Sequence, residues 1–269
     1  MKKVILLSFV AILVLAQCSF ANTVGVLGKL NTTEEDFPKM FNDEIRSDVL
    51  ANGANKNDVN YRFYDSLNAM QMALSKGEID SMLMPDSIAD FILASDSSYN
   101  LKGVAALRYP HVLAFGFAGN NSFLRHMFND SLSGMERDGT LGKLIMTYVN
   151  NIGVKNPMKV SFPEFKEGMT VRVAVTGDLP PVDYVAADGT PAGFNTAVLA
   201  EISRRLKVNI QVIQVESGAR AAALTSGRAD CAFWFEGYSK GNELVFDAPE
   251  GLIFSNPYYN WHKFFYVGK

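Results

Sequence analysis

The fold is decided by a short stretch of sequence that occurs twice in this chain. Ala73–Asp80 reads ALSKGEID, and Ala223–Asp230 reads ALTSGRAD. In both copies an Ala/Leu-rich helix ends at a glycine, the residue best able to adopt the left-handed conformation that closes a helix. An apolar segment begins soon after the aspartate, at Met82–Met84 in the first copy and at Ala232–Phe235 in the second. Both copies therefore predict a helix followed by a buried strand.

The similarity extends upstream of both copies. Thr32-Thr33-Glu34-Glu35 predicts a helix start with a capping box, and Thr196–Leu206 carries apolar residues at helical spacing. Short β-branched segments before and after these helices predict further strands: Val24–Leu27, Val59–Tyr64, Val171–Val175 and Asn209–Val215. Each half thus reads strand, helix, strand, helix, strand. Such alternation is typical of parallel β–α–β units with right-handed crossovers, so we predict an α/β fold with an internal repeat.

The segment between the halves predicts one buried strand and two helices. Val112–Phe117 is apolar throughout, and Ser122 and Thr140 are each placed to begin a helix. Asn150–Glu167 contains glycine and prolines and predicts an exposed connection.

Composition excludes several classes of function. The net charge is −3 and no basic stripe stands out, which argues against nucleic acid as a partner. The three histidines (His111, His126 and His262) are scattered, with no Cys/His cluster to predict a zinc site. Neither a phosphate-binding Gly-Lys-Ser/Thr loop nor a Gly-x-Ser-x-Gly elbow is present. No cofactor is predicted.

The N-terminus predicts export. Lys2 and Lys3 precede the apolar run Val4–Ala16, and Ser19-Phe20-Ala21 has small residues at the two positions that a signal peptidase reads. The run is shorter than the roughly 20 apolar residues that span a bilayer. We therefore predict a signal peptide over residues 1–21 and a periplasmic protein that starts at Asn22.

A lipid anchor is the alternative at this end of the chain. Leu15-Ala16-Gln17-Cys18 resembles a bacterial lipobox, although Gln17 stands where that motif has a small residue. After cleavage at Ala21 the mature chain keeps one cysteine, Cys231, and so forms no internal disulfide.

Several motifs of the C-terminal segment occur together in one known family. They are Pro180-Pro181, Asp188-Gly189, Gly193-Phe194, Leu224–Asp230 and Phe254-Ser255-Asn256-Pro257-Tyr258. In this order, residues 170–269 resemble the opening segment of periplasmic solute-binding proteins of the amino-acid ABC-transporter type, family 3. Residues 23–103 resemble the second lobe of that family, and residues 104–149 resemble its closing segment. The order is that of a circular permutation, with Asn150–Glu167 as the joint.

The resemblance implies a two-lobed periplasmic-binding-protein fold, each lobe a mixed or parallel sheet flanked by helices, with the ligand cleft between the lobes. Residues 22–105 form the smaller lobe and residues 106–269 the larger one, which divides into 106–149, the linker 150–167, and 168–269. We expect the two mature termini to lie close together beside the hinge, so that only one of the two connections between the lobes is a continuous chain.

The implied function is the capture of a small polar molecule, an amino acid or a related amine or carboxylate, by hinge closure. The membrane partner is an ABC permease or a sensor kinase, and a monomer is expected. The alternative is an exported enzyme on the same scaffold, such as a cyclohexadienyl-dehydratase-like lyase, for which Glu236 and Asp178 are the available carboxylates. No His partner, metal or activated nucleophile accompanies them, so binding is favoured and no catalytic residue is predicted.

Candidate ligand-binding residues of the larger lobe follow its strands, since ligands bind at the carboxyl ends of strands in open α/β sheets. Asp178 and Tyr184 follow the first strand, although Tyr184 could equally pack in the Asp-Gly hairpin. Trp234, Phe235, Glu236 and Tyr238 follow the last strand, where two aromatic rings beside a carboxylate suit a flat or apolar group and a cation. Alternation along the strand indicates that only one of Trp234 and Phe235 belongs to the core.

The sequence departs from the family at the arginine that grips a ligand carboxylate, because Asn242 stands there. Arg220 could replace that grip, or could be a solvated surface residue. From the smaller lobe, a helix N-terminus at Thr32 and Thr33 would offer backbone N–H groups to an anion, or the threonines could only cap the helix. Asp86 lies near the family's amine-binding aspartate, or caps the helix from Ser87 to Leu93.

Overall fold

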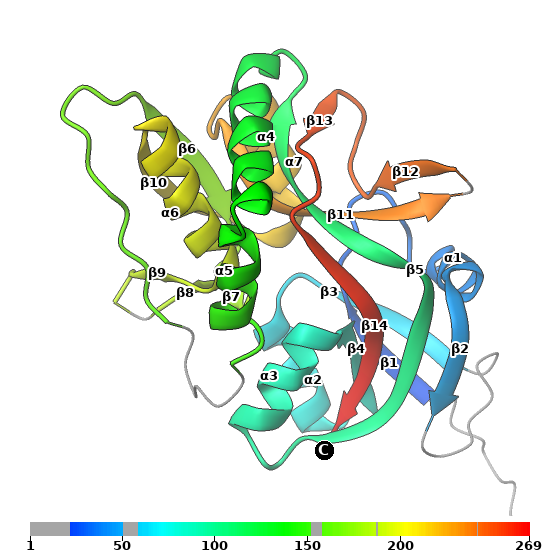
Figure 1. Cartoon of the computed structure of the whole chain (residues 1–269). Helices are drawn as coiled ribbons and strands as arrows, with labels where there is room; N and C mark the ends of the chain where they lie inside the picture. Colours follow the sequence, from blue (N-terminus) through cyan, green and yellow to red (C-terminus); the bar gives the residue numbers. More distant parts are fainter. Residues whose placement is uncertain (1–21, 51–58, 152–157, 187, 241) are drawn as a thin grey trace, which may run out of the picture.

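The computed structural model describes residues 22–50, 59–151, 158–186, 188–240 and 242–269 (Figure 1). Within these residues one mixed sheet of 11 strands runs through the molecule, in the order β10-β6-β11-β5-β14-β4-β1-β3, with β2, β12 and β13 paired at its sides. The strands are β1 (Asn22–Leu27), β2 (Ile45–Leu50), β3 (Val59–Tyr64), β4 (Ser81–Pro85), β5 (Asn100–Ala118), β6 (Thr170–Val175), β10 (Asn209–Gln214), β11 (Cys231–Lys240), β12 (Glu243–Phe246), β13 (Leu252–Phe254) and β14 (Tyr259–Gly268).

Helices pack against the sheet in both halves of the molecule. They are α1 (Phe37–Glu44), α2 (Leu67–Lys76), α3 (Asp86–Ser95), α4 (Ser122–Arg137), α5 (Thr140–Tyr148), α6 (Phe194–Leu206) and α7 (Arg220–Thr225). In Figure 1 α4, α6 and α7 of the larger half lie in the upper part of the view, and α2 and α3 of the smaller half lie in the lower part.

The internal repeat predicted from the sequence is present in the sheet. In the smaller half β1 lies between β3 and β4 and is parallel to both. In the larger half β6 lies between β10 and β11 and is likewise parallel to both. Of the three strands predicted for each half, the first therefore lies between the other two. The predicted glycine cap is also present, since Gly77 closes α2 at φ 71° and its N–H donates to the carbonyls of Ala73 and Leu74.

Two long antiparallel strands join the halves. The first part of β5 pairs with β2, and its second part pairs with β11 and β13. The strand β14 pairs with β5 along most of its length and reaches β4 at its end, where Val267 lies opposite Met82. The two-lobed α/β fold is confirmed. Both connections are continuous strands, so the expectation that one of them would be broken was wrong.

The ends of the described chain meet, but not beside the hinge. Thr23 exchanges backbone and side-chain hydrogen bonds with Asp80, and a Cβ on Gly268 would come within 3.0 Å of the carbonyl oxygen of Asp80. Asp80 precedes β4, whose other end faces the larger half. The expected position was wrong because β14 continues past the hinge to the outer end of the smaller half. The exact division of the lobes and the permuted order stay predictions.

The helix predicted from Thr32 begins later, at Phe37. Asp36 is the N-cap residue and Pro38 stands in the first turn, where a missing N–H has no cost. The hydroxyl of Thr33 accepts a hydrogen bond from the N–H of Asp36 and so stabilises the turn before the helix. The prediction of a capping box that starts the helix at Thr32 was therefore wrong.

Apolar packing fills both halves. The largest cluster lies between α4, α6 and the strands of the larger half and continues under α2 and α3, with Phe115, Phe194 and Trp261 fully buried. Cys231 is buried and free. No helix of the described segments is long and apolar enough to cross a membrane. The predicted signal peptide and Cys18 lie outside the described residues.

Candidate functional site

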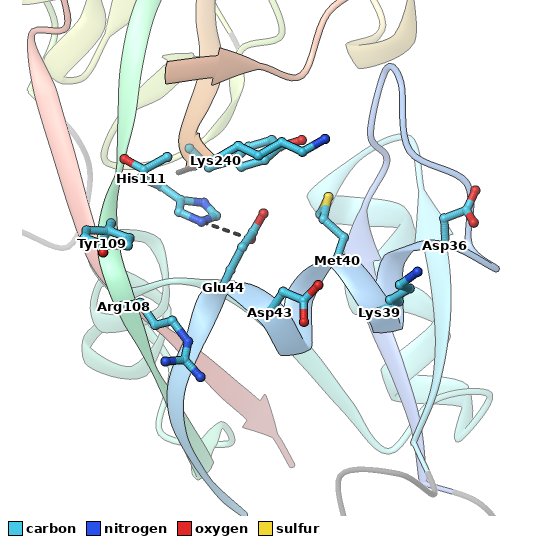
Figure 2. Close-up of a pocket in the computed structure, with 11 residues that line it drawn as sticks. Asp36, Lys39, Met40, Asp43, Glu44, Arg108, Tyr109, His111 and Lys240 are labelled. Atoms are coloured by element: carbon cyan, nitrogen blue, oxygen red, sulfur yellow. Dashed lines mark ion pairs between the residues drawn. The ribbon is translucent and has the colours of Figure 1, made fainter. Parts of the chain in front are cut away.

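A cluster of charged side chains lies where the two halves meet; we call it the interlobe cluster. Its members are Lys29, Glu44, His111 and Glu236. Lys29 follows β1 and forms an ion pair with Oε2 of Glu236 in β11. The Nδ1 of His111 in β5 lies 2.5 Å from Oε1 of Glu236, and its Nε2 lies 3.1 Å from Oε2 of Glu44 in α1 (Figure 2). One imidazole thus links a carboxylate of the smaller half to a carboxylate of the larger half.

The close contacts keep Lys29, His111 and Glu236 ionised. Burial disfavours the charged form of His111, but its contacts with Glu236 and Glu44 outweigh burial and raise its pKa from 6.5 to about 9. Burial also opposes ionisation of Glu236, but Lys29 and His111 hold its pKa well below its usual range. At Lys29 burial is outweighed by its carboxylate neighbours, and the pKa is raised. Lys29, His111 and Glu236 are therefore all charged at neutral pH.

Arg220, at the start of α7, adds a buried positive charge. Its side chain donates hydrogen bonds to the backbone carbonyls of Ser217, Phe233 and Trp234. Its guanidinium carbon stands 4.5 Å from the centre of the Trp234 ring, a cation–π contact. The residue is 3% exposed, and burial lowers its pKa to about 10, so it stays protonated. Within the described part of the chain it forms no salt bridge, although the carboxylates of Asp183, Asp247 and Glu236 act on its charge from nearby.

Lys29 and Glu236 of the interlobe cluster, together with Arg220, border a narrow cavity between the halves, the interlobe cavity. Its volume is about 20 Å³, close to the space that a single water molecule needs. Both halves contribute to its walls: Val26, Leu27, Gly28, Lys29, Leu83, Pro85, Arg220, Trp234, Glu236, Asp247, Trp261 and Phe264. A larger ligand can enter only if the halves move apart or the Lys29–Glu236 pair separates.

Hydrogen bonds across the junction hold the halves in this closed arrangement. Asp247, after β12, accepts hydrogen bonds from the N–H groups of Leu30 (2.8 Å) and Asn31 (2.9 Å) in the loop after β1. Asp178, in the short strand β7 (Asp178–Leu179), accepts one from the N–H of Leu67 at the start of α2 (3.0 Å). Carboxylates of the larger half thus bind backbone donors of the smaller half.

Three of the predicted ligand-binding residues line the interlobe cavity: Arg220, Trp234 and Glu236. The surface position considered for Arg220 is wrong, since its side chain is buried. Trp234 has a positive φ of 33° at an irregularity in the pairing of β11 with β5, which turns its ring toward Trp261. Phe235 packs against Phe254 in one core cluster, and Trp234, which is 6% exposed, belongs to another. The indication from alternation that only one of the two aromatics is core was therefore wrong, because the irregular pairing of β11 buries both rings.

The other predicted residues lie elsewhere. Tyr184 sits in β8 (Asp183–Val185), between β7 and β9 (Pro191–Ala192), in the small hairpin sheet. Asp86 begins α3 and accepts a hydrogen bond from the N–H of Ser87, so its carboxylate supports the helix start. Thr32 and Thr33 line no part of the interlobe cavity, because α1 begins after them. Tyr238 lines a separate pocket beside His111.

Sequence reasoning missed Lys29, His111 and Asp247. Lys29 had a usable signal, because it directly follows a parallel strand at the edge where ligands bind. His111 and Asp247 had none, since their partners come from distant parts of the chain. Among the described residues, no group of His, Cys, Asp and Glu side chains is arranged to hold a metal ion.

Comparison with known families identifies the C-terminal segment. Residues 171–269 match the model of bacterial extracellular solute-binding proteins, family 3. This is the segment whose motifs resembled the opening of that family, so the resemblance is confirmed there. A search of the curated proteins found no match.

Solved structures with a similar chain path share little sequence with this chain. The ligand-binding component of an ABC-type import system from Staphylococcus aureus, solved with zinc bound, is 10% identical, with a TM-score of 0.42 over 91% of this chain and 65% of that one. The binding protein AgaA of A. tumefaciens R10, in complex with agropinic acid, is 13% identical, with a TM-score of 0.42 over 78% and 55%. A putative L-cystine ABC transporter protein from Listeria monocytogenes is 11% identical, with a TM-score of 0.40 over 92% and 82%. This chain thus spans less than two thirds of the first two.

Proposed function

We propose that this protein is an exported solute-binding protein that closes its two lobes around a small polar molecule and presents it to a membrane partner. The observation that carries the proposal is the interlobe cavity, where Lys29 from the smaller half meets Arg220 and Glu236 from the larger half. Such convergence suits capture by hinge closure, because the ligand completes its contacts only when both lobes meet. The family match of residues 171–269 supports the same class.

The charges at the cavity suit an amino acid or a related amine or carboxylate. Arg220 is a buried cation that forms no salt bridge among the described residues. A ligand carboxylate could therefore form an ion pair with its guanidinium group. Glu236 is a buried anion whose partner Lys29 comes from the opposite lobe, so a ligand ammonium could replace Lys29 when the lobes open. The rings of Trp234 and Trp261 would pack on the apolar part of the ligand.

Export and partnership follow from the same proposal. The mature chain would begin at Asn22 in the periplasm and serve an ABC permease or a sensor kinase. The lobes would be assembled from a permuted order of family segments, with residues 22–105 forming most of the smaller one.

A thermal-shift screen with amino acids, amines and carboxylic acids tests the proposal. A ligand of the interlobe cavity should raise the Tm of the wild-type protein and of Glu250→Gln, a control at an exposed carboxylate. Glu236→Gln should weaken the binding of that ligand by about 1.5 to 3 kcal/mol, because a charge-assisted contact is lost. Equal affinity of Glu236→Gln and Glu250→Gln would remove Glu236 from the site. Conversion of the ligand, followed by NMR, would indicate an enzyme instead.

A further inference from the structure

A second cavity lies on the other side of His111 from the interlobe cavity; we call it the hinge pocket (Figure 2). Its volume is about 430 Å³. It is lined by α1 and the preceding turn, by the part of β5 that crosses between the lobes, and by the end of β11: Asp36, Lys39, Met40, Asp43, Glu44, Arg108, Tyr109, His111, Tyr238, Ser239 and Lys240. Both lobes and the hinge strand therefore contribute to one pocket.

The hinge pocket contains a buried carboxylate with an unused acceptor. The side chain of Glu44 is 10% exposed, and Figure 2 shows it directed between His111 and Met40. Its Oε2 forms an ion pair with Nε2 of His111 at 3.1 Å, but neither Oε1 nor Oε2 has a hydrogen-bond partner among the described residues. A buried carboxylate oxygen without a donor is costly, so Glu44 favours an occupant that brings an N–H group.

The outer part of the pocket carries the opposite charge. Lys39, Arg108 and Lys240 are exposed and form no ion pair with any described residue. Asp36 and Asp43 also line this part, and Asp43 adds negative charge next to Glu44. The unpartnered acceptors of Glu44 and the unpaired cations of the outer part together match a molecule with an ammonium group at one end and a carboxylate at the other.

The remaining walls suit an apolar body between these two ends. Tyr109 and Tyr238 contribute rings, and Met40 contributes a polarisable thioether that packs well on aromatic groups. The ring of Tyr238 lies 6.1 Å from that of His111.

We propose that the hinge pocket is a second binding site, separate from the interlobe cavity, for a small zwitterion with an apolar body, whose ammonium binds Glu44 and whose carboxylate binds Arg108. Glu44 and Glu236 contact opposite nitrogens of the same imidazole, so an occupant of the hinge pocket is linked through His111 to the interlobe cluster. The proposal does not depend on which ligand, if any, the interlobe cavity takes.

Titration with L-phenylalanine, followed by calorimetry and by NMR of the histidine rings, tests this site. The chain has three histidines, so the ring signals of His126 and His262 are internal controls. Binding should shift the His111 signals and leave the other two in place. Glu44→Gln and Arg108→Gln should each weaken binding about tenfold or more, whereas Glu250→Gln should not. Phenethylamine should bind more weakly than phenylalanine, and 3-phenylpropionate should bind most weakly, because it lacks the ammonium.

Trp234→Leu separates the two cavities, since Trp234 lines only the interlobe one. Phenylalanine binding that is lost in Trp234→Leu and kept in Glu44→Gln would place the ligand in the interlobe cavity and overturn the proposal. Failure of phenylalanine and phenethylamine to bind at millimolar concentration would also overturn it. Arg108 is exposed, so Arg108→Gln keeps the test valid if Glu44→Gln does not fold.

Discussion

Replacing His111 with glutamine should remove most of the pH dependence of unfolding between pH 6.5 and about 9. Burial alone would lower the pKa of His111, but Glu236 and Glu44 outweigh it and raise the pKa to about 9. The folded protein therefore keeps a proton that the unfolded chain releases above pH 6.5. Since one pKa unit corresponds to about 1.4 kcal/mol, this shift contributes about 3 kcal/mol to the free energy of unfolding. The contribution is fully present below pH 6.5 and is lost as the pH rises through 9.

Other groups whose pKa is strongly shifted titrate outside this window. Burial raises the pKa of Asp183 to about 6 and those of Tyr61 and Tyr259 to about 12. Burial also raises the pKa of the Cys231 thiol. The contribution of this thiol to the free energy of unfolding is the same in wild type and variant, so it cancels when the two are compared at the same pH.

Urea unfolding at several pH values and constant ionic strength measures the effect. The wild type should lose about 3 kcal/mol of unfolding free energy across the window, and His111→Gln should lose much less. His126→Gln, a change at an exposed histidine of α4, should follow the wild type. A flat wild-type profile, or the same slope in His111→Gln, would refute the assignment of a charged His111 between Glu44 and Glu236.

Further predictions concern packing, closure and export. Gly116→Ala should destabilise the fold by about 1 to 3 kcal/mol in urea unfolding, because its Cβ would come within 2.2 Å of the Phe235 ring. Gly142→Ala, in open space within α5, should stabilise the fold by about 0.5 to 1 kcal/mol. The same change in unfolding free energy for Gly116→Ala and Gly142→Ala would contradict the packing described for β5. Asp247→Ala should raise the radius of gyration in small-angle scattering, since it removes the acceptor for Leu30 and Asn31; an unchanged radius would mean that these bonds do not hold the lobes closed. N-terminal sequencing of the exported protein should begin at Asn22, and a diacylated Cys18 would show that the lipobox functions.

The repeated strands and helices could be predicted from the sequence because their signals are local. The apolar segments around Val24, Val171 and Met82 became parallel strands since each must be buried on both faces between neighbours. Gly77 ended its helix because the left-handed C-cap needs a residue without a side chain. In contrast, the start of α1 was misplaced because Thr33 caps a turn, and Pro38 sets the first turn of the helix.

The charged site could be predicted only in part. Arg220, Trp234 and Glu236 come from one lobe, and a local pattern of strand and helix ends was enough to find them. The strand predicted to end at Phe235 continues to Lys240, so Trp234 and Glu236 lie within β11 and not after it. Their partners Lys29 and His111 come from distant segments, and no local pattern pairs them. The bend of Trp234 into the cavity depends on an irregular register between β11 and β5, which forms only when the two strands meet.

Native mass spectrometry of protein purified gently from its own host would show directly whether this protein holds a ligand at Glu236. We expect one unmodified small polar molecule per chain, retained by the wild type and by Glu250→Gln and lost from Glu236→Gln. A wild-type protein that retains nothing, or that converts the retained molecule to a product on incubation, would contradict the account of a binding protein that closes on its ligand at Glu236.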